Sequence, residues 1–260
     1  MHGGSSIPLT PLRERWYGIG VKRPRLRPLL PELDPTGFPA FRDRILEAEA
    51  DGPTHVLRRY PGYPRVELPR PRHRRLPRFD DVVARRRTSR AFEPRQPDAR
   101  ALSSWLELGH GVTGPDGRGP TASAGNLQAV QLVLVPLCPG WLEAGAYHYD
   151  REQHGLARIA QDTGDWNDAV PSLSQGPGAP LLVVLAGEET AVAQKYGERG
   201  LRFLLLEAGQ VLQSLGLAAA AGGLSVTPMG GYFEGQVHAR TGLGPDDLIL
   251  AVAVAGPPAK

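Results

Sequence analysis

A run of arginines with a hydroxyl among them, Arg86-Arg87-Thr88-Ser89-Arg90-Ala91-Phe92, has the chemistry to hold a phosphate group. Guanidinium and hydroxyl groups give phosphate oxygens charge-assisted hydrogen bonds, each worth roughly 1.5 to 3 kcal/mol. Arg86, Thr88 and Arg90 alternate along the chain, so their side chains would share one side of an extended segment, and Arg87 adds a further cation. We predict an anion site here. A solvated arginine cluster is the alternative.

A second stretch, Ser123-Ala124-Gly125-Asn126-Leu127-Gln128, combines small residues with two amides. Small residues let a ligand approach the backbone closely. The two amides offer donors and acceptors to the edge of a planar ring. The candidate binding residues are Ser123, Ala124, Gly125, Asn126 and Gln128. The alternative is an ordinary turn rich in Ser, Gly and Asn.

A third stretch, Thr227-Pro228-Met229-Gly230-Gly231, places two glycines directly after an apolar segment. A flat ligand can lie against a glycine backbone because no side chain collides with it. We predict that Pro228, Met229, Gly230 and Gly231 contact such a ligand. A turn between a strand and a loop has the same residue preferences and is the alternative.

The pair Lys195-Tyr196 could transfer a proton. A lysine whose pKa is lowered by burial can act as a base, and a neighbouring tyrosine can orient or share the proton. The chain has only three lysines, Lys22, Lys195 and Lys260, and otherwise uses arginine, which cannot act as a base. Lys195 and Tyr196 are therefore candidates for proton transfer. The alternative for Lys195 is a solvent-exposed residue at the start of a helix.

In this order along the chain, the stretches resemble the motifs of the flavin-binding nitroreductase superfamily. The resemblance is closest to its SagB-type branch, the FMN-dependent dehydrogenases of azole-forming peptide pathways. The Lys195-Tyr196 pair is similar to the catalytic pair of that branch. The amide loop departs from the family pattern at Ala122 and Ala129, where the family has prolines. The resemblance covers about residue 79 to the C-terminus.

The resemblance implies FMN as the cofactor. It places Arg86 and Thr88 on the phosphate and Arg90 at the pyrimidine edge of the ring, where a cation stabilises reduced flavin. It brings the loop around Gly125 to the flavin from the neighbouring subunit, so it implies a homodimer with two interfacial sites. It also places the Thr227 to Gly231 segment over the ring, with a backbone N–H directed at flavin N5.

Three functions remain open at this stage. The first is an FMN-dependent dehydrogenase that oxidises azoline rings in peptides to azoles, with a candidate peptide substrate and cyclodehydratase partners implied by the resemblance. The second is an NAD(P)H-dependent reductase of nitro compounds, quinones or activated double bonds, which uses the same flavin geometry. The third is a non-catalytic flavin-fold module, or a nucleic-acid-binding module that uses a basic arm.

Hydrophobic periodicity predicts the elements that position these motifs. We expect helices over 41–49, 79–86, 98–108 and 199–221, and strands over 130–137, 145–149, 180–186, 224–226 and 248–255. The predicted fold is an α+β nitroreductase fold with a mixed central sheet flanked by helices, over residues 79–260. The helix at 199–221 is apolar on most of its circumference, so we expect it to be buried rather than to span a membrane.

A proline- and arginine-rich arm is predicted over residues 1–78. Residues 1–80 hold 13 of the 26 prolines, which excludes a mainly helical arm. Residues 1–90 carry a net charge of +10, against −7 for residues 91–260. Such asymmetry fits either packing of the arm on the acidic body or binding of nucleic acid, and we favour the former because no nucleic-acid-binding motif accompanies the arginines.

The remaining features of the sequence concern the cellular location of the protein and its metal content. Cys138 is the only cysteine, so no internal disulfide can form. The N-terminus lacks the charged start and apolar stretch of a signal peptide, and we expect a cytoplasmic protein without membrane contact. The seven histidines show no ligand spacing, so we predict no metal site.

Overall fold

The computed structural model describes residues 38–50, 57–71, 76–114, 117–161 and 164–260. The chain divides into two units, residues 1–32 and 33–260, and every described residue belongs to the second unit. Most of the predicted arm, including residues 1–37, therefore lies outside the described residues.

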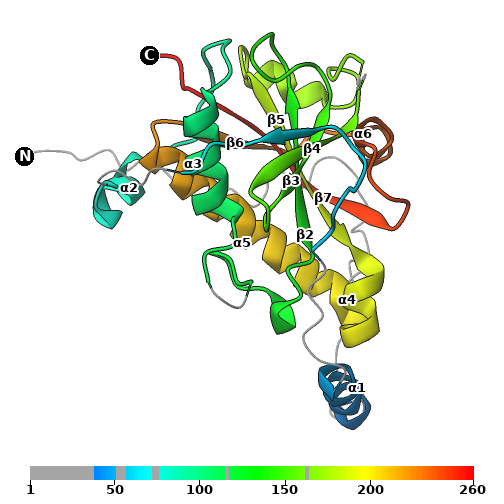
Figure 1. Ribbon diagram of the computed structural model, residues 1–260. Helices are drawn as coiled ribbons and strands as arrows, with labels where there is room; N and C mark the ends of the chain where they lie inside the picture. The colour runs from blue at the N-terminus through cyan, green and yellow to red at the C-terminus, as the bar shows by residue number, and fades with distance from the viewer. Residues whose placement is uncertain (1–37, 51–56, 72–75, 115–116, 162–163) are drawn as a thin grey trace, which may run out of the picture. The chain divides into compact units, whose positions relative to one another are not determined.

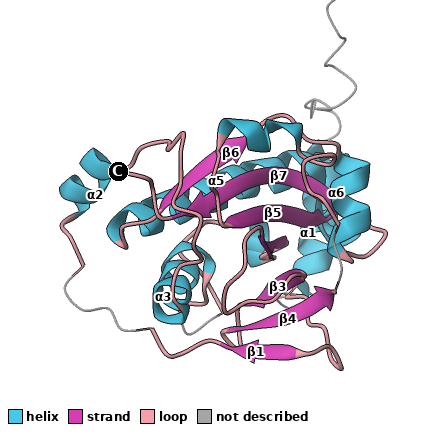
Figure 2. Ribbon diagram, turned by 90° about the horizontal axis from the view of Figure 1, so that it is seen from above, coloured by secondary structure: helices cyan, strands magenta, loops and turns pink. Residues whose placement is uncertain are grey.

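Seven described strands form one sheet in the order β1-β4-β3-β2-β5-β7-β6, with β1 and β6 at opposite edges (Figures 1 and 2). The strands are β1 Arg65–Glu67, β2 Val130–Pro136, β3 Ala146–Asp150, β4 Gly155–Ala160, β5 Leu181–Glu188, β6 Ser225–Met229 and β7 Asp247–Gly256. The α-helices are α1 Phe38–Ala50, α2 Phe79–Arg85, α3 Ala99–His110, α4 Glu189–Tyr196, α5 Gly200–Ala221 and α6 Glu234–Thr241. The predicted α+β class is confirmed.

The six ladders between described strands are all antiparallel, whereas we predicted a mixed sheet. Strands β5 and β6 do run in the same direction, because each is antiparallel to β7. Helices α4 and α5 form the crossover between them. The C-terminal strand β7 is inserted between β5 and β6, so this crossover creates no parallel ladder.

Strands β2, β3, β5, β6 and β7 match the predicted strands within a few residues. Strands β1 and β4 were not predicted. Strand β4 follows β3 through a tight turn in which His154 has φ 48°, and β1 pairs with β4 in the register Val66 to Leu156. The arm predicted over 1–78 therefore contributes an edge strand to the sheet.

Helices α3 and α5 cover one face of the sheet. Leu102 and Leu106 of α3 and Leu215 of α5 are fully buried against Leu132 and Leu134 of β2. The alternating residues of β2, Val133 and Val135, lie on the opposite face of the sheet. The segment 164–179 and helix α6 cover that face. This alternation along β2 is the period of two that a strand covered on both faces requires.

Helix α3 begins where the sequence predicted. The Asp98 carboxylate accepts hydrogen bonds from the backbone N–H groups of Arg100 (2.9 Å) and Ala101 (2.8 Å), which is the N-cap geometry. Trp105 then joins α3 to α5, since its Nε1–H donates to the carbonyl of Leu215 at 2.9 Å.

Helix α5 spans 22 residues. The stretch Glu189–Ala221 is long and apolar enough to cross a membrane by length and composition alone, and 39% of its most apolar window is buried. The helix packs against α3 and the sheet along one face. Leu205 and Leu206 are exposed on another. We therefore interpret α5 as a core helix with one exposed face.

Candidate active site

The loop around Gly125 has a left-handed backbone at three positions. Gly125, Asn126 and Gln128 have φ values of 56°, 57° and 54°. Glycine adopts this region freely, but each of the other two residues costs on the order of 1 to 3 kcal/mol there. Such a conformation persists only where surrounding contacts enforce it. The loop is thus held in its shape by the rest of the protein.

Hydrogen bonds within the loop supply part of that enforcement. The Gln128 N–H donates to the Ser123 hydroxyl at 2.8 Å, and the Gln128 Nε2 donates to the Asn126 side-chain oxygen at 2.8 Å. The side-chain oxygen of Asn126 is therefore directed at Gln128, and the side-chain nitrogen is directed away from it.

Arg151 stabilises the loop through hydrogen bonds. Its Nη1 donates to Gln128 Oε1 at 2.6 Å, and its Nε donates to the carbonyl of His110 at 2.5 Å. Arginine can only donate, so it fixes which end of the Gln128 amide is the oxygen. Burial, the largest cause, lowers the pKa of Arg151, while the charge of Glu207 opposes that shift.

Glu207 of α5 holds the other end of the loop. Its carboxylate accepts the Val130 N–H at 3.2 Å and hydrogen-bonds with the Ser123 hydroxyl. Burial raises the pKa of this carboxyl, although the bonds to Ser123 and Val130 and the charge of Arg151 act against the rise. Two buried, opposite charges therefore anchor the loop at both of its ends.

Lys195 and Tyr196 lie against this loop. They occupy the last turn of α4, with only 9% and 8% of their surfaces exposed. A Cβ added at Gly125 would lie 2.7 Å from Lys195 Nζ and still closer to the Tyr196 hydroxyl. The alternative of a solvent-exposed lysine at a helix start is wrong, because Lys195 is buried at a helix end.

A cavity of about 750 Å³ opens beside this contact. Its walls include Ser123, Gly125, Asn126, Gln128 and Lys195. The second predicted motif and the predicted catalytic lysine thus line one cavity in a single chain. That volume falls in the range of small-molecule and cofactor sites.

The arginine run and the Thr227–Gly231 stretch meet elsewhere in the chain. The Ser89 N–H donates to Thr227 Oγ1 at 3.1 Å, and the Thr227 hydroxyl donates to the Ser89 carbonyl at 2.9 Å. Ser225 of β6 likewise donates to the carbonyl of Arg87 at 3.1 Å. The arginine run is therefore fixed alongside β6.

The arginines of that run are available to an anion. Arg87 and Arg90 are exposed and Arg86 is half-buried. No carboxylate of the described residues forms an ion pair with any of the three. Thr88 between them is exposed as well.

The two glycines of the Thr227–Gly231 stretch have different surroundings. Gly230 is exposed, and no atom lies within 4 Å of the point where its Cβ would be. Gly231 is held by Ser172, whose hydroxyl donates to the Gly231 carbonyl at 2.8 Å. Of their neighbours, Pro228 is exposed and Met229 is buried in the core. A flat ligand can therefore approach Gly230.

The four motifs thus form two half-sites at opposite ends of α5. The cavity half contains Lys195, whose neighbour Tyr196 makes an edge-on ring contact with Phe203 of α5, with ring centroids 4.8 Å apart. In the arginine half, Arg86 lies beside Gly216 of α5. Phe203 and Gly216 are 13 positions apart on the helix, which is about 20 Å at 1.5 Å per residue. Figure 1 shows α4 at one end of α5 and α2, which leads into the arginines, at the other.

The sequence did not reveal Arg151 or Glu207 as parts of the site. Arg151 directly follows β3. In so arginine-rich a chain, one arginine after a strand does not indicate a functional site. Glu207 did interrupt the most apolar helix of the chain, and a carboxylate in such a place is a signal of a buried polar partner. Among the described residues no three His, Cys, Asp or Glu side chains gather as a metal site would require.

A family model described as the nitroreductase family matches residues 83–256, more than half of the chain. The chain belongs to the nitroreductase family. It is accordingly an oxidoreductase. The Methanocaldococcus jannaschii protein named Putative nitroreductase MJ1384 is 27% identical over 163 residues, which are 62% of this chain and 82% of that protein.

Solved structures share the fold of this nitroreductase-family chain. Crystal structures assigned as nitroreductases from Anabaena variabilis and Ralstonia eutropha have TM-scores of 0.67 and 0.64 at 20% and 19% identity. They cover 76% and 80% of this chain; the match spans 42% of the Anabaena chain and 98% of the Ralstonia chain. A chain of the Escherichia coli microcin synthetase McbBCD complex with truncated pro-MccB17 bound has a TM-score of 0.56 at 18% identity, over 98% of this chain and 85% of that one.

Members of the nitroreductase family typically bind FMN. The residues of this chain fit that cofactor. Three arginines without a carboxylate partner among the described residues, beside the exposed Thr88, match a phosphate, and the open space before Gly230 matches a ring. The amides of the Gly125 loop are held in fixed orientation by Arg151, as recognition of a ring edge requires.

Proposed function

We propose that the chain is an FMN-dependent dehydrogenase of the SagB type that oxidises azoline rings in a peptide to azoles. The observation that carries the proposal is the contact of buried Lys195 with the Gly125 loop at the wall of the 750 Å³ cavity. A base held at a binding cavity is what proton abstraction from a carbon acid needs. A plain flavin reductase needs no such lysine.

The similarity to the microcin synthetase chain also supports the proposal. That match covers 98% of this chain, whereas the nitroreductase family model begins at residue 83. The complex contains truncated pro-MccB17. A peptide substrate, and partner proteins that act on it, are the corresponding proposals for this chain.

Each residue of the cavity half has a role in the proposed reaction. The neutral Lys195 amine takes the proton from the azoline carbon and becomes an ammonium group, and Tyr196 orients the amine and shares the proton. Arg151 and Glu207 keep the loop amides in place, so the substrate ring meets Lys195 in one orientation. FMN, when bound, supplies the two-electron hydride acceptor.

The residues of the arginine half hold the cofactor. Arg86, Arg87 and Thr88 would bind the FMN phosphate, and Arg90 would bind the pyrimidine edge of the ring. The ring would be held by the backbone of Pro228, Met229, Gly230 and Gly231. The bonds of Ser89 and Ser225 keep the arginine run beside this surface.

A homodimer brings the two half-sites together. In a two-fold symmetric pair whose α5 helices pack antiparallel, the cavity half of one chain lies beside the arginine half of the other. The outer face of α5 suits this contact. It exposes the apolar Leu205 and Leu206 and the small Gly209, which permit close helix packing, beside the uncharged polar residues Gln210 and Gln213.

Mixed dimers test the shared site. We expect Lys195→Ala and Arg90→Gln homodimers to be nearly inactive, and their mixture after subunit exchange to regain activity. A mixed dimer then has one site with both substitutions and one with neither. Turnover of an azoline peptide, per mixed dimer, should approach half of the wild-type rate.

A matched mixture provides the control. Lys195→Ala and Tyr196→Phe both lie in the cavity half, so their mixed dimer has a damaged residue in each site and should stay inactive. Equal recovery in both mixtures, or none in either, would contradict the interfacial site.

A second candidate function is an NAD(P)H-dependent nitroreductase. It is favoured by the named relative from Methanocaldococcus jannaschii, which is 27% identical to this chain. The two functions share the half-sites and differ in the direction in which electrons pass, so the electron donor separates them.

A further inference from the structure

The helix that carries Lys195 and Tyr196 cannot hold its position alone. Helix α4 has eight residues and no side-chain hydrogen bond at its N-cap, Glu188. Isolated helices shorter than about 12 residues are marginal in water, so tertiary contacts must fix this one. Contacts at the two ends of α4 therefore determine where Lys195 and Tyr196 lie.

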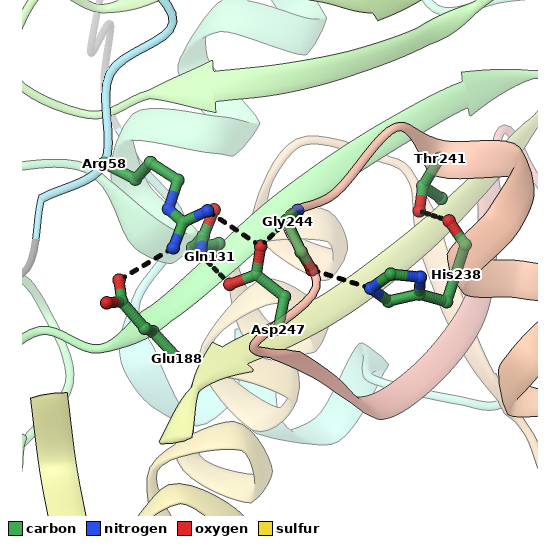
Figure 3. Close-up of polar contacts among 7 residues, drawn as sticks. All are labelled: Arg58, Gln131, Glu188, His238, Thr241, Gly244 and Asp247. Carbon is green, nitrogen blue, oxygen red and sulfur yellow. Dashed lines mark hydrogen bonds and ion pairs between the residues drawn. The ribbon is translucent and has the colours of Figure 1, made fainter. Parts of the chain in front are cut away.

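Arg58 holds the N-terminal end of α4 (Figure 3). Its Nη2 donates to the Glu188 carboxylate at 2.9 Å, and its Nη1 donates to the Asp247 carboxylate at 3.0 Å. Glu188 directly precedes α4, and Asp247 begins β7. One guanidinium thus ties the start of the catalytic helix to the neighbouring strand.

The receiving carboxylate is rigid. The Asp247 side chain is 0% exposed and also accepts bonds from Gln131 Nε2 and the Gly244 N–H, each at 2.8 Å. A planar guanidinium bound to this fixed carboxylate and to Glu188 has little freedom, since its donors form a rigid fork. The adjacent arginine behaves differently: Arg59 is exposed and pairs with the partly exposed Glu152 at the surface.

Helix α1 holds the C-terminal end of α4. The Phe41 ring lies 6.5 Å from the Tyr196 ring, and the Arg199 guanidinium lies 5.6 Å from the centre of the Phe41 ring. Ile45 joins the same apolar cluster, which also contains Leu127 of the amide loop. Helix α1 thus contacts the catalytic pair and the loop against which that pair rests.

We propose that Phe41 and Arg58 act as two clamps that position α4, and with it Lys195 and Tyr196, against the Gly125 loop. The proposal rests on the proposed catalytic role of that pair. Both clamps precede residue 83, where the nitroreductase family model begins. Residues of the basic N-terminal segment therefore help to position the catalytic pair.

Hydrogen exchange tests the clamps without reference to activity. Arg58→Gln removes the N-terminal clamp, and Arg59→Gln is its matched control. Phe41→Ala removes the other clamp, and Leu46→Ala, at an exposed position of the same helix, is its control. We expect amide exchange in residues 189–196 to quicken at least tenfold in Arg58→Gln and Phe41→Ala, with α3 unchanged, and neither control to alter it.

Turnover of an azoline peptide then tests what the clamps do. We expect kcat to fall at least tenfold in both clamp variants, with KM and FMN content unchanged, and Arg58→Lys to recover part of kcat because it can still reach one carboxylate. If Arg58→Gln does not fold, Phe41→Ala decides the matter, because it leaves the buried carboxylate paired.

The outcomes separate this inference from the proposed function. Unchanged exchange in residues 189–196 overturns the clamps, whatever the activity. Quickened exchange with unchanged kcat overturns their positioning role. Full activity of Lys195→Ala overturns the proposed function, while the exchange result still reports whether the clamps hold α4.

Discussion

Lys195→Ala should lower the kcat for azoline oxidation by about 100- to 10,000-fold, which is the contribution typical of a positioned general base. FMN content should stay the same, because we propose that the arginine half of the site, and not Lys195, holds the phosphate. The structure explains the size of the effect, since Lys195 is 9% exposed and sits at the wall of the cavity, where bulk water is a poor substitute. Steady-state kinetics with an azoline peptide, together with the flavin absorbance per subunit, measure both quantities.

Lys195→Arg is the sharper control for this prediction. It keeps a positive charge at the end of a long side chain but cannot accept a proton from carbon, because arginine remains protonated in proteins. We expect it to be as slow as the alanine variant. If arginine restored the rate, the lysine would serve as a charge, and its assignment as the base would be wrong.

Gly125→Ala should disturb catalysis more than stability. The new methyl group would lie 2.7 Å from Lys195 Nζ and closer to the Tyr196 hydroxyl. Both atoms are the far ends of side chains, so the protein can fold by displacing them. We expect the free energy of unfolding to fall by about 1 to 2 kcal/mol, the cost of a left-handed alanine. Displacement of a catalytic group by about 1 Å can cost on the order of 100-fold in rate, and we expect kcat to fall by about that factor.

Gly62→Ala separates backbone strain from displacement of the pair. Gly62 also has a positive φ, 85°, but no atom lies within 4 Å of the position of its Cβ. It occupies the turn before the edge strand β1, away from the cavity. This variant should lose a similar free energy of unfolding and keep its kcat. A similar loss of kcat in both variants would show that strain alone explains the effect at Gly125.

The sequence was informative where local rules decide the structure. Asp98 predicted the start of α3 because an aspartate side chain can bond the first free N–H groups of a helix. The apolar run of β2 predicted a strand covered on both faces. The sheet was predicted to be mixed, but every ladder between described strands is antiparallel, because β7, from the far end of the chain, lies between β5 and β6. No local pattern encodes such an insertion.

For the candidate site as well, local features could be predicted from the sequence and contacts between distant residues could not. The residue types of the four motifs were recognisable, because phosphate, ring edge and proton transfer each demand particular side chains. Their grouping into two half-sites was not, since it depends on which elements meet at each end of α5. Arg151, Glu207 and Arg58 were missed for a related reason: each acts through a contact with a residue distant in sequence, namely Gln128, Ser123 and Glu188.

The most direct test of the proposed dehydrogenase is the response of the protein's flavin absorbance near 450 nm in the absence of oxygen. An azoline-containing peptide, NADH and NADPH would each be mixed with the purified wild-type protein and with Lys195→Ala. We predict prompt bleaching of the wild-type protein by the azoline peptide, loss of that bleaching in Lys195→Ala, and an unchanged spectrum with either nicotinamide. Rapid bleaching by NADH or NADPH, with no response to the azoline peptide, would contradict the dehydrogenase and identify the chain as a reductase.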